Sequence, residues 1–244
     1  MLTYALPGGY TLRCRQLTLL AIIAIGLLFI RLGIWQLHRY HEKKNILQQH
    51  ALAASMVPLS IKQVLARQQR DYLPLRASGY FQSNQVILLQ QDVRFQARGY
   101  DVLEPLRVPG HHRWLLVNRG WLPMHGQSLP TVVPIHGHVQ LLGHVKVPDV
   151  SGLILGPEIF NPGQWPLKVQ RIRIAAIARL LHHPLYPFVL RLNPMNNSLF
   201  RREWVVVNVS PQRHMSYALQ WFAFAATLWV AYGCFIIRGV KDAS

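Results

Sequence analysis

Charged residues are scarce in this sequence, and acidic residues are scarcer still. Only 14% of its 244 residues are charged, whereas an ordinary soluble domain has roughly 25%. Nine Asp and Glu stand against 26 Lys and Arg, a formal net charge of +17. A disordered basic tail would be poor in hydrophobic and aromatic residues, so 51% hydrophobic and 10% aromatic residues exclude that class. The positive charge must therefore be confined to one part of the chain.

Cysteine is almost absent as well. The two cysteines, Cys14 and Cys234, lie near the ends of the chain, so the long region between them can form neither a disulfide nor a thiolate metal site. The sequence has no C-x-x-C redox pair and no C-x-x-C-H haem attachment motif. It also lacks G-x-S-x-G, phosphate-loop and H-E-x-x-H motifs, and its few carboxylates are scattered. A hydrolase is possible, but no motif supports one, and we expect that the protein is not an enzyme.

Two stretches explain the shortage of charge. Residues 17–37 contain one charge, Arg31, and the 23 residues from Met215 to Ile237 contain none. About 20 apolar helical residues cross the hydrocarbon layer of a membrane. Arg31 lies near the end of its stretch, where a long side chain reaches the interface. We expect transmembrane helices over residues 17–37 and 214–237.

The first stretch predicts a retained anchor rather than a removable signal peptide. It is followed by H-R-Y-H-E-K-K, without a cleavage site of small residues directly after the apolar run. Only 16 residues precede it, which leaves no room for a mitochondrial presequence. We therefore expect a bacterial inner (plasma) membrane.

The basic residues that flank the two stretches predict the orientation. Arg13 and Arg15 precede the first, and Arg238 and Lys241 follow the second. Short positive flanks stay in the cytoplasm. The tails, residues 1–16 and 238–244, should therefore be cytoplasmic.

Residues 38–213 should then form a periplasmic domain. They carry 21 basic and 8 acidic residues, a net charge of +13, and a loop of this length escapes the positive-inside rule. A basic surface in that place is expected to meet anionic lipid or an acidic partner rather than nucleic acid.

The central domain is predicted to be rich in β-strands. We expect strands at Leu75–Phe81, Gln85–Gln90, Gly99–Val108, Arg113–Trp121, His138–Val147, Pro187–Leu192 and Glu203–Val209. Helices are expected at residues 39–54 as an extension of the first span, from a Ser60 cap to Gln69, and at Ile172–Leu181. The fold class is α+β: two transmembrane helices flank a mainly antiparallel sheet or small barrel with accessory helices.

Histidine pairs raise the alternative of a metal site. The pairs are His111 and His112, His136 and His138, and His182 and His183. An H-x-H pair on a strand points both imidazoles to one face, whereas adjacent histidines point to opposite faces. Nothing in the sequence shows that the pairs converge, and solvated surface histidines are commoner. A periplasmic metal carrier or a hydrolase is therefore an alternative that the sequence does not favour.

The beginning of the second apolar stretch is more informative. His214, Tyr217 and Trp221 are spaced i, i+3 and i+7, so they share one helix face. An imidazole there could ligate haem iron axially, with the two aromatic rings flanking the porphyrin. The commoner interpretation is an aromatic belt with an interfacial histidine, and Trp35 and Arg39 would likewise be interface anchors.

Three motifs together resemble a known family. They are L-G-x-W-Q-x-x-R at residues 32–39, W-L-L-V-N-R-G-W-L-P at residues 114–123 and H-M-S-Y-A-L-Q-W-F at residues 214–222. Gly79-Tyr80-Phe81 and the stretch from Gly99 to Pro105 support them. The combination resembles the surfeit locus protein one family of cytochrome oxidase assembly factors over nearly the whole chain.

The resemblance implies a part in assembling a haem-copper terminal oxidase, by helping haem a into the catalytic subunit. Haem a would be a transient cofactor, and the implied partners are the catalytic subunit, haem a synthase and membrane lipid. The family's functional histidine matches His214. The family often has Asn before that histidine and Leu after it, where this chain has Arg213 and Met215. Arg213 either pairs with a haem propionate or is an interfacial charge.

The expected haem site consists of His214 as ligand, Tyr217 and Trp221 as walls, and Trp35 with Gln36 as a second wall. Residues 118–121, Asn-Arg-Gly-Trp, are expected to serve packing and a turn rather than a partner. The alternative function is a scaffold that stabilises oxidase assembly intermediates without binding haem.

Overall fold

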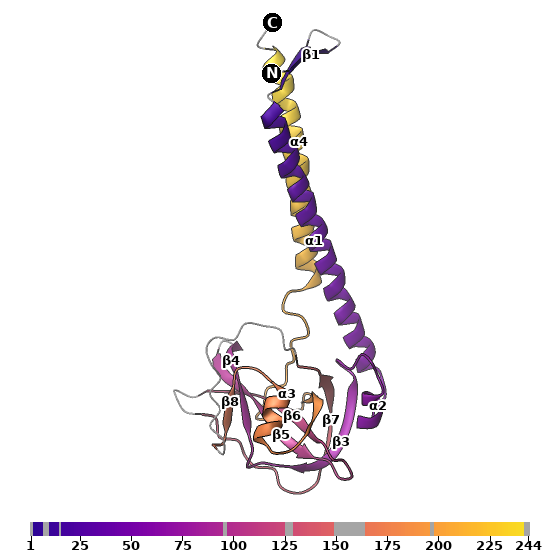
Figure 1. Cartoon of the computed structure of the whole chain (residues 1–244), viewed down its shortest axis with the longest axis vertical. Coiled ribbons are helices and arrows are strands. Elements are labelled where there is room, and N and C mark those ends of the chain that lie inside the picture. The colour runs from indigo at the N-terminus through magenta and orange to yellow at the C-terminus, as the bar shows by residue number, and fades with distance from the viewer. Residues whose placement is uncertain are drawn as a thin grey trace. The chain divides into compact units, whose positions relative to one another are not determined.

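The computed structural model describes residues 2–6, 10–14, 16–94, 97–124, 129–148, 164–195 and 198–241. The chain forms two compact units (Figure 1). The first combines residues 1–48 with residues 206–244, and the second consists of residues 49–205. We describe each unit by itself.

The first unit contains one long helix, most of a second long helix and one hairpin. Helix α1 is Gln16–Ala54, helix α4 is Pro211–Lys241, and strands β1 (Leu2–Leu6) and β2 (Tyr10–Cys14) form an antiparallel hairpin that the sequence did not predict. Both helices are long and apolar enough to cross a membrane. At 1.5 Å per residue α1 is about 58 Å long, which exceeds the roughly 30 Å of bilayer hydrocarbon. The predicted helical extension over residues 39–54 is confirmed.

Helices α1 and α4 run side by side (Figure 1) and approach closely at two glycines. A Cβ on Gly33 would lie 2.5 Å from Cε1 of Phe222, and a Cβ on Gly26 would clash with the indole of Trp229. Gly26 and Gly33 are seven residues apart and therefore share one helix face. Small residues let apolar helices pack closely where no hydrophobic force drives them together. Large aromatic rings of α4 thus pack against the glycine positions of α1.

The second unit is built on a seven-stranded sheet. Its strands are β3 (Pro74–Phe81), β4 (Ile87–Arg94), β5 (Ala97–Arg107), β6 (Trp114–Pro123), β7 (Val139–Lys146), β8 (Leu167–Val169) and β9 (Leu185–Leu192). The strand order is β3-β7-β9-β6-β5-β4-β8, and β3 also pairs with β5. That last pairing closes β3, β7, β9, β6 and β5 into a ring, and β4 and β8 extend from β5. The β6–β9 and β4–β8 pairs are parallel and the others antiparallel. A barrel-like mixed sheet confirms the predicted fold class of this domain.

The core of the ring explains why two continuous apolar runs occur in the sequence. Leu115, Leu116 and Val117 on β6 are fully buried, as are Ile87 and Leu88 on β4. Successive strand residues point to opposite faces, so a run buried throughout needs cover on both faces. On one face of β6 lies the barrel interior, and on the other lies a second cluster that includes helix α3 (Ile174–Leu180).

Helix α2 (Ile61–Leu65) begins at the predicted cap. The Ser60 side chain accepts a hydrogen bond from the backbone N–H of Gln63, and the Gln63 side chain accepts one from the Ser60 N–H at 2.8 Å. This reciprocal capping box satisfies two free donors at the helix start. The helix ends four residues before the predicted end at Gln69.

The predicted strand at Glu203–Val209 is wrong: these residues form no strand. The run of tryptophan and valine residues there favours a strand, but the ring offers no free edge, because β9 is already paired with β6 and β7. The segment is held through side chains instead, and Trp204 Nε1 donates to the carbonyl of Leu192 at 2.8 Å. The short strand β8 was missed because three residues carry no periodic signal.

Candidate functional site

His214 lies in the first turn of α4, and the structure brings it to Gln36 of α1. Nδ1 of His214 lies 2.8 Å from Oε1 of Gln36, although the two residues are 178 positions apart. With the Gln36 amide oxygen as the acceptor, Nδ1 is the donor, and in the neutral imidazole the lone pair then lies on Nε2. No residue that the structure describes hydrogen-bonds to Nε2. His214 therefore presents an available nitrogen of defined tautomer.

The two aromatic residues on the His214 face have different surroundings. Trp221 is half-buried between the helices, with ring centroids 5.6 Å from Phe29 of α1 and 5.9 Å from Phe224. Tyr217, one turn from His214, is 45% exposed. Trp221 thus contributes to the packing of α1 on α4, whereas the face of Tyr217 stays open.

Trp35 does not join this group. Gly33 and Gln36 face α4, and residue 35 is rotated about 100° from residue 36 around the helix. Trp35 is accordingly 50% exposed, and the guanidinium of Arg39 lies 5.9 Å from its ring centroid. The structure therefore brings Gln36 to His214 and leaves Trp35 on another face of α1. Arg213 is exposed at the start of α4.

The Asn-Arg-Gly-Trp motif near the end of β6 is buried inside the second unit. Asn118 and Trp121 are 2% and 1% exposed. The Asn118 side chain donates to Asp101 at 3.3 Å and accepts from the Gly120 N–H at 3.0 Å. Gly120 has φ +123°, and a Cβ there would lie 2.9 Å from the carbonyl oxygen of Arg201. Only glycine adopts that backbone without strain, so the motif serves packing and a bend, as the sequence predicted.

A buried ion pair holds the arginine of the same motif. Nη1 of Arg119 donates to Oε2 of Glu104 at 2.8 Å, with side-chain exposures of 6% and 0%. Burial raises the pKa of the Glu104 carboxyl, although Arg119 opposes the shift. Next to this pair, the backbones of Trp121 and Arg201 exchange two hydrogen bonds of 2.9 and 3.0 Å. β6 thereby fixes the start of the segment that leads towards α4.

The histidine pairs do not form a metal centre within the described residues. His136, His182 and His183 line one cavity of about 600 Å³ together with Trp114, on which His183 stacks at 3.9 Å. His111 is elsewhere, bonded to the Tyr186 hydroxyl at 2.5 Å. No three His, Cys, Asp or Glu side chains in the described part are placed to hold a metal ion. His136 and His138 precede β7, so this pair does not present two imidazoles on one strand face.

Comparison with known proteins supplies the family. The model of the SURF1 family matches residues 23–226. The chain belongs to the SURF1 family. It is also 22% identical over 211 residues to a SURF1-like protein of Rickettsia conorii (strain ATCC VR-613 / Malish 7), covering 84% of this chain and 85% of that protein. The SURF1 family, known for its part in cytochrome oxidase assembly, is the one that the three motifs resemble, and the matched range includes Gln36 and His214.

Sequence reasoning placed Gln36 in the expected haem site only as part of a wall and missed its bond to His214. It also missed Phe29, whose ring lies 5.6 Å from that of Trp221. A signal was available: glycines at positions 26 and 33 of an apolar helix indicate close approach of a second helix. Gln36 is three residues after Gly33 and therefore belongs to the same face.

Proposed function

We propose that this SURF1 family protein assists the insertion of haem a into the catalytic subunit of a cytochrome oxidase, with His214 as the axial ligand of haem in transit. The hydrogen bond from His214 to Gln36 carries the proposal. Histidines that ligate a metal almost always donate their other ring N–H to an acceptor, which fixes the ring and raises its basicity. Gln36 supplies that acceptor and leaves Nε2 for iron.

The neighbouring residues suit temporary rather than permanent binding. His214 would be the one side chain that holds the iron, so haem could be handed on to the recipient. The exposed ring of Tyr217 offers a flat apolar face beside His214, and Trp221 stiffens the helix pair behind it. The exposed guanidinium of Arg213 suits a haem propionate. These side chains hold and release cargo, and no chemical reaction is needed.

We place both long helices in the bacterial inner membrane, with cytoplasmic termini and the barrel unit in the periplasm. Their length and apolar surface support insertion, and the basic flanks support the orientation. Haem a synthase is the proposed donor of the haem and the oxidase catalytic subunit its recipient. The net charge of +13 on residues 38–213 suits an anionic lipid surface rather than nucleic acid.

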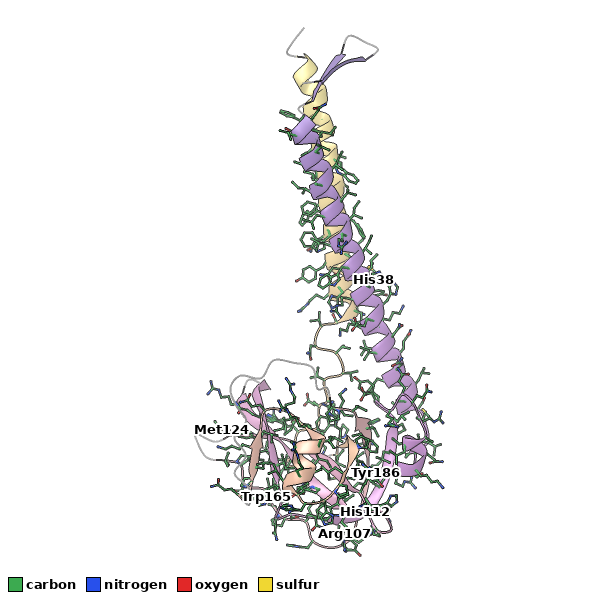
Figure 2. The ribbon with its side chains drawn as sticks, viewed as in Figure 1. His38, Arg107, His112, Met124, Trp165 and Tyr186 are labelled. Carbon is green, nitrogen blue, oxygen red and sulfur yellow. The ribbon has the colours of Figure 1, made fainter. Side chains whose placement is uncertain are left out.

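The decisive experiment is the visible spectrum of the full chain purified from cells that make haem a. We expect stoichiometric haem in the wild type and at least about a tenfold loss in His214→Ala, because axial ligation supplies much of the affinity. His38→Ala is the matched control, since His38 is an exposed histidine of α1 (Figure 2). Wild-type protein without haem would overturn the carrier function and leave the scaffold. Equal haem content in His214→Ala and His38→Ala would show that His214 does not ligate the haem.

A further inference from the structure

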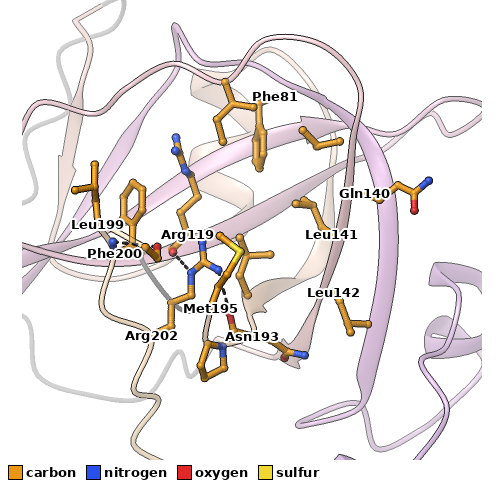
Figure 3. A pocket seen from close by; sticks show the side chains of 15 residues that line it. Phe81, Arg119, Gln140, Leu141, Leu142, Asn193, Met195, Leu199, Phe200 and Arg202 are labelled. Atoms are coloured by element: carbon orange, nitrogen blue, oxygen red, sulfur yellow. Dashed lines mark hydrogen bonds between the residues drawn. The ribbon is translucent and has the colours of Figure 1, made fainter.

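We propose that the barrel unit binds a single-chain amphiphile with an anionic headgroup, in a cavity between β7 and the segment that follows β9. The cavity has a volume of about 580 Å³, within the roughly 300–1,000 Å³ of small-molecule sites. Figure 3 shows it with Phe81, Arg119 and Arg202 around the space. All its residues belong to the second unit, and the proposal is independent of haem and of His214.

The walls and rim of the cavity are apolar. Phe81 and Leu192 are buried in its walls. At the rim, three large apolar side chains remain exposed to water: Leu142 at 43%, Met195 at 64% and Leu199 at 77%. Single exposed apolar residues are common, but several around one apolar cavity indicate a binding surface. An alkyl chain lying in the cavity would cover them.

Arg202 gives the cavity an unneutralised positive charge. Its Nε donates to the carbonyl of Arg119 at 2.8 Å and its Nη1 to the carbonyl of Asn193 at 3.0 Å (Figure 3). Both acceptors are neutral, and no carboxylate among the described residues forms an ion pair with Arg202. Burial lowers the pKa of its guanidinium, and the charge of Arg119 adds to the shift. A half-buried cation beside another cation is unfavourable unless an anion joins it.

The second arginine of the cavity, Arg119, already forms an ion pair within the protein. Arg119 is paired with the buried Glu104, and its guanidinium carbon lies 4.6 Å from the ring centroid of Phe200. Arg119 therefore forms part of the wall, whereas the positive charge of Arg202 is available to pair with an anionic ligand. One available cation beside an apolar cavity predicts a ligand with one anionic group and one apolar chain.

A carboxylate and a phosphate monoester share the chemistry that a guanidinium recognises, because both accept paired charge-assisted hydrogen bonds. Free fatty acids and single-chain phospholipids are the two sources of such a ligand. An alkyl alcohol has the same chain without the charge, and an alkyl ammonium carries the wrong charge. Comparing these headgroups on the same alkyl chain separates the contribution of Arg202 to ligand binding from that of the apolar walls.

The test is photo-crosslinking of the full chain in phosphatidylcholine nanodiscs. The probes are a short diazirine-bearing alkyl carboxylate and the corresponding phosphate, alcohol and ammonium, and labelled peptides are mapped by mass spectrometry. We expect about tenfold more labelling around Leu142, Met195 and Leu199 with the anionic probes than with the alcohol, which corresponds to one charge-assisted hydrogen bond. The anionic probe that labels the protein more strongly, carboxylate or phosphate, shows whether the ligand is a fatty acid or a single-chain phospholipid. Equal labelling by the alcohol or ammonium would overturn the proposal.

Four variants make the result specific. Arg202→Gln should remove the preference for anions, and Arg202→Lys should keep most of it. Leu142→Asp should reduce labelling at least about tenfold, because it places a negative charge on the rim, while the hydrogen bonds of Arg202 stay intact. Val57→Asp is the matched control, since Val57 is 81% exposed and lies outside the cavity. Unchanged labelling in Leu142→Asp, or equal loss in Val57→Asp, would refute the site even if Arg202→Gln fails to fold.

Discussion

At the residue scale, the hydrogen bond to Gln36 decides which nitrogen of His214 is available. Histidine alone has two interchangeable tautomers, and an interfacial histidine in water would sample both. The amide oxygen of Gln36, 2.8 Å from Nδ1, selects the tautomer with a lone pair on Nε2. The glutamine of the L-G-x-W-Q stretch of this chain thereby has a defined contact.

Replacing Gln36 by leucine should weaken haem retention without removing the ligand. Loss of such an outer acceptor typically costs about 10–100-fold in metal affinity, so we expect a fall of that size in haem affinity, measured by titrating the purified apo-protein. Gln220→Leu, the same change at an exposed position of α4, should have little effect. If the two variants retain haem equally, the hydrogen bond to His214 has no part in binding.

The buried pair of Glu104 and Arg119 gives a stability prediction. Arg119→Met would leave the fully buried Glu104 without its partner, and breaking a buried pair costs about 3–5 kcal/mol. Lys146→Met removes a partly exposed ion pair with Asp71 and should cost no more than about 1 kcal/mol. Denaturant unfolding of the full chain, followed by tryptophan fluorescence, measures both values. The double variant Glu104→Leu with Arg119→Met should recover most of the loss, and a double variant as unstable as Arg119→Met would contradict this account.

At the element scale, strands and helices with strong local signals were predictable, and those that depend on distant partners were not. The apolar runs of β4 and β6 and the capping sequence at Ser60 specify their elements locally. Glu203–Val209 has an equally good strand pattern, but its potential partners in the ring are already paired. Local propensity therefore predicts a strand there that the closed ring cannot accept.

Close packing of α1 on α4 predicts that Gly33 tolerates no side chain. Gly33→Ala places a methyl group against the Phe222 ring, and overpacking of this kind costs about 1–3 kcal/mol. We expect Gly33→Ala to unfold at a lower dodecyl sulfate concentration than the wild type. It should also lose haem, because Gln36 shifts away from His214. Gly233→Ala is the matched control, because nothing lies within 4 Å of a Cβ at Gly233. Equal unfolding of the two variants would show that the helices do not pack as described.

At the scale of the whole molecule, the location of the charged residues along the chain says more about membrane insertion and orientation than the total charge does. Two helices that together contain long charge-free segments account for the low charge content, and residues 38–213 hold most of the basic excess. The charge-free segments support membrane insertion, whereas the basic flanks, and not the charge of residues 38–213, are the basis of the proposed orientation across the inner membrane.

The orientation predicts which cysteines a membrane-impermeant maleimide reaches. In a chain whose Cys14 and Cys234 are replaced by serine, His112→Cys should react in intact spheroplasts, because His112 is exposed in the barrel unit (Figure 2). Ser244→Cys should react only after the membrane is permeabilised, since its flank is basic. Labelling of Ser244→Cys in intact spheroplasts would reverse the topology.

The sequence by itself determined the two apolar spans, most strands of the barrel unit and the family, because these follow from periodicity, length and short motifs that neighbouring residues define. Tertiary structure alone decided the rest. The bond between His214 and Gln36, the closure of the ring by β3 and β5 and the cavity beside Arg202 all join residues far apart in the chain. Such contacts depend on how helices and strands pack together. Packing depends on how side chains from distant elements fit one another, which the periodicity of neighbouring residues does not specify.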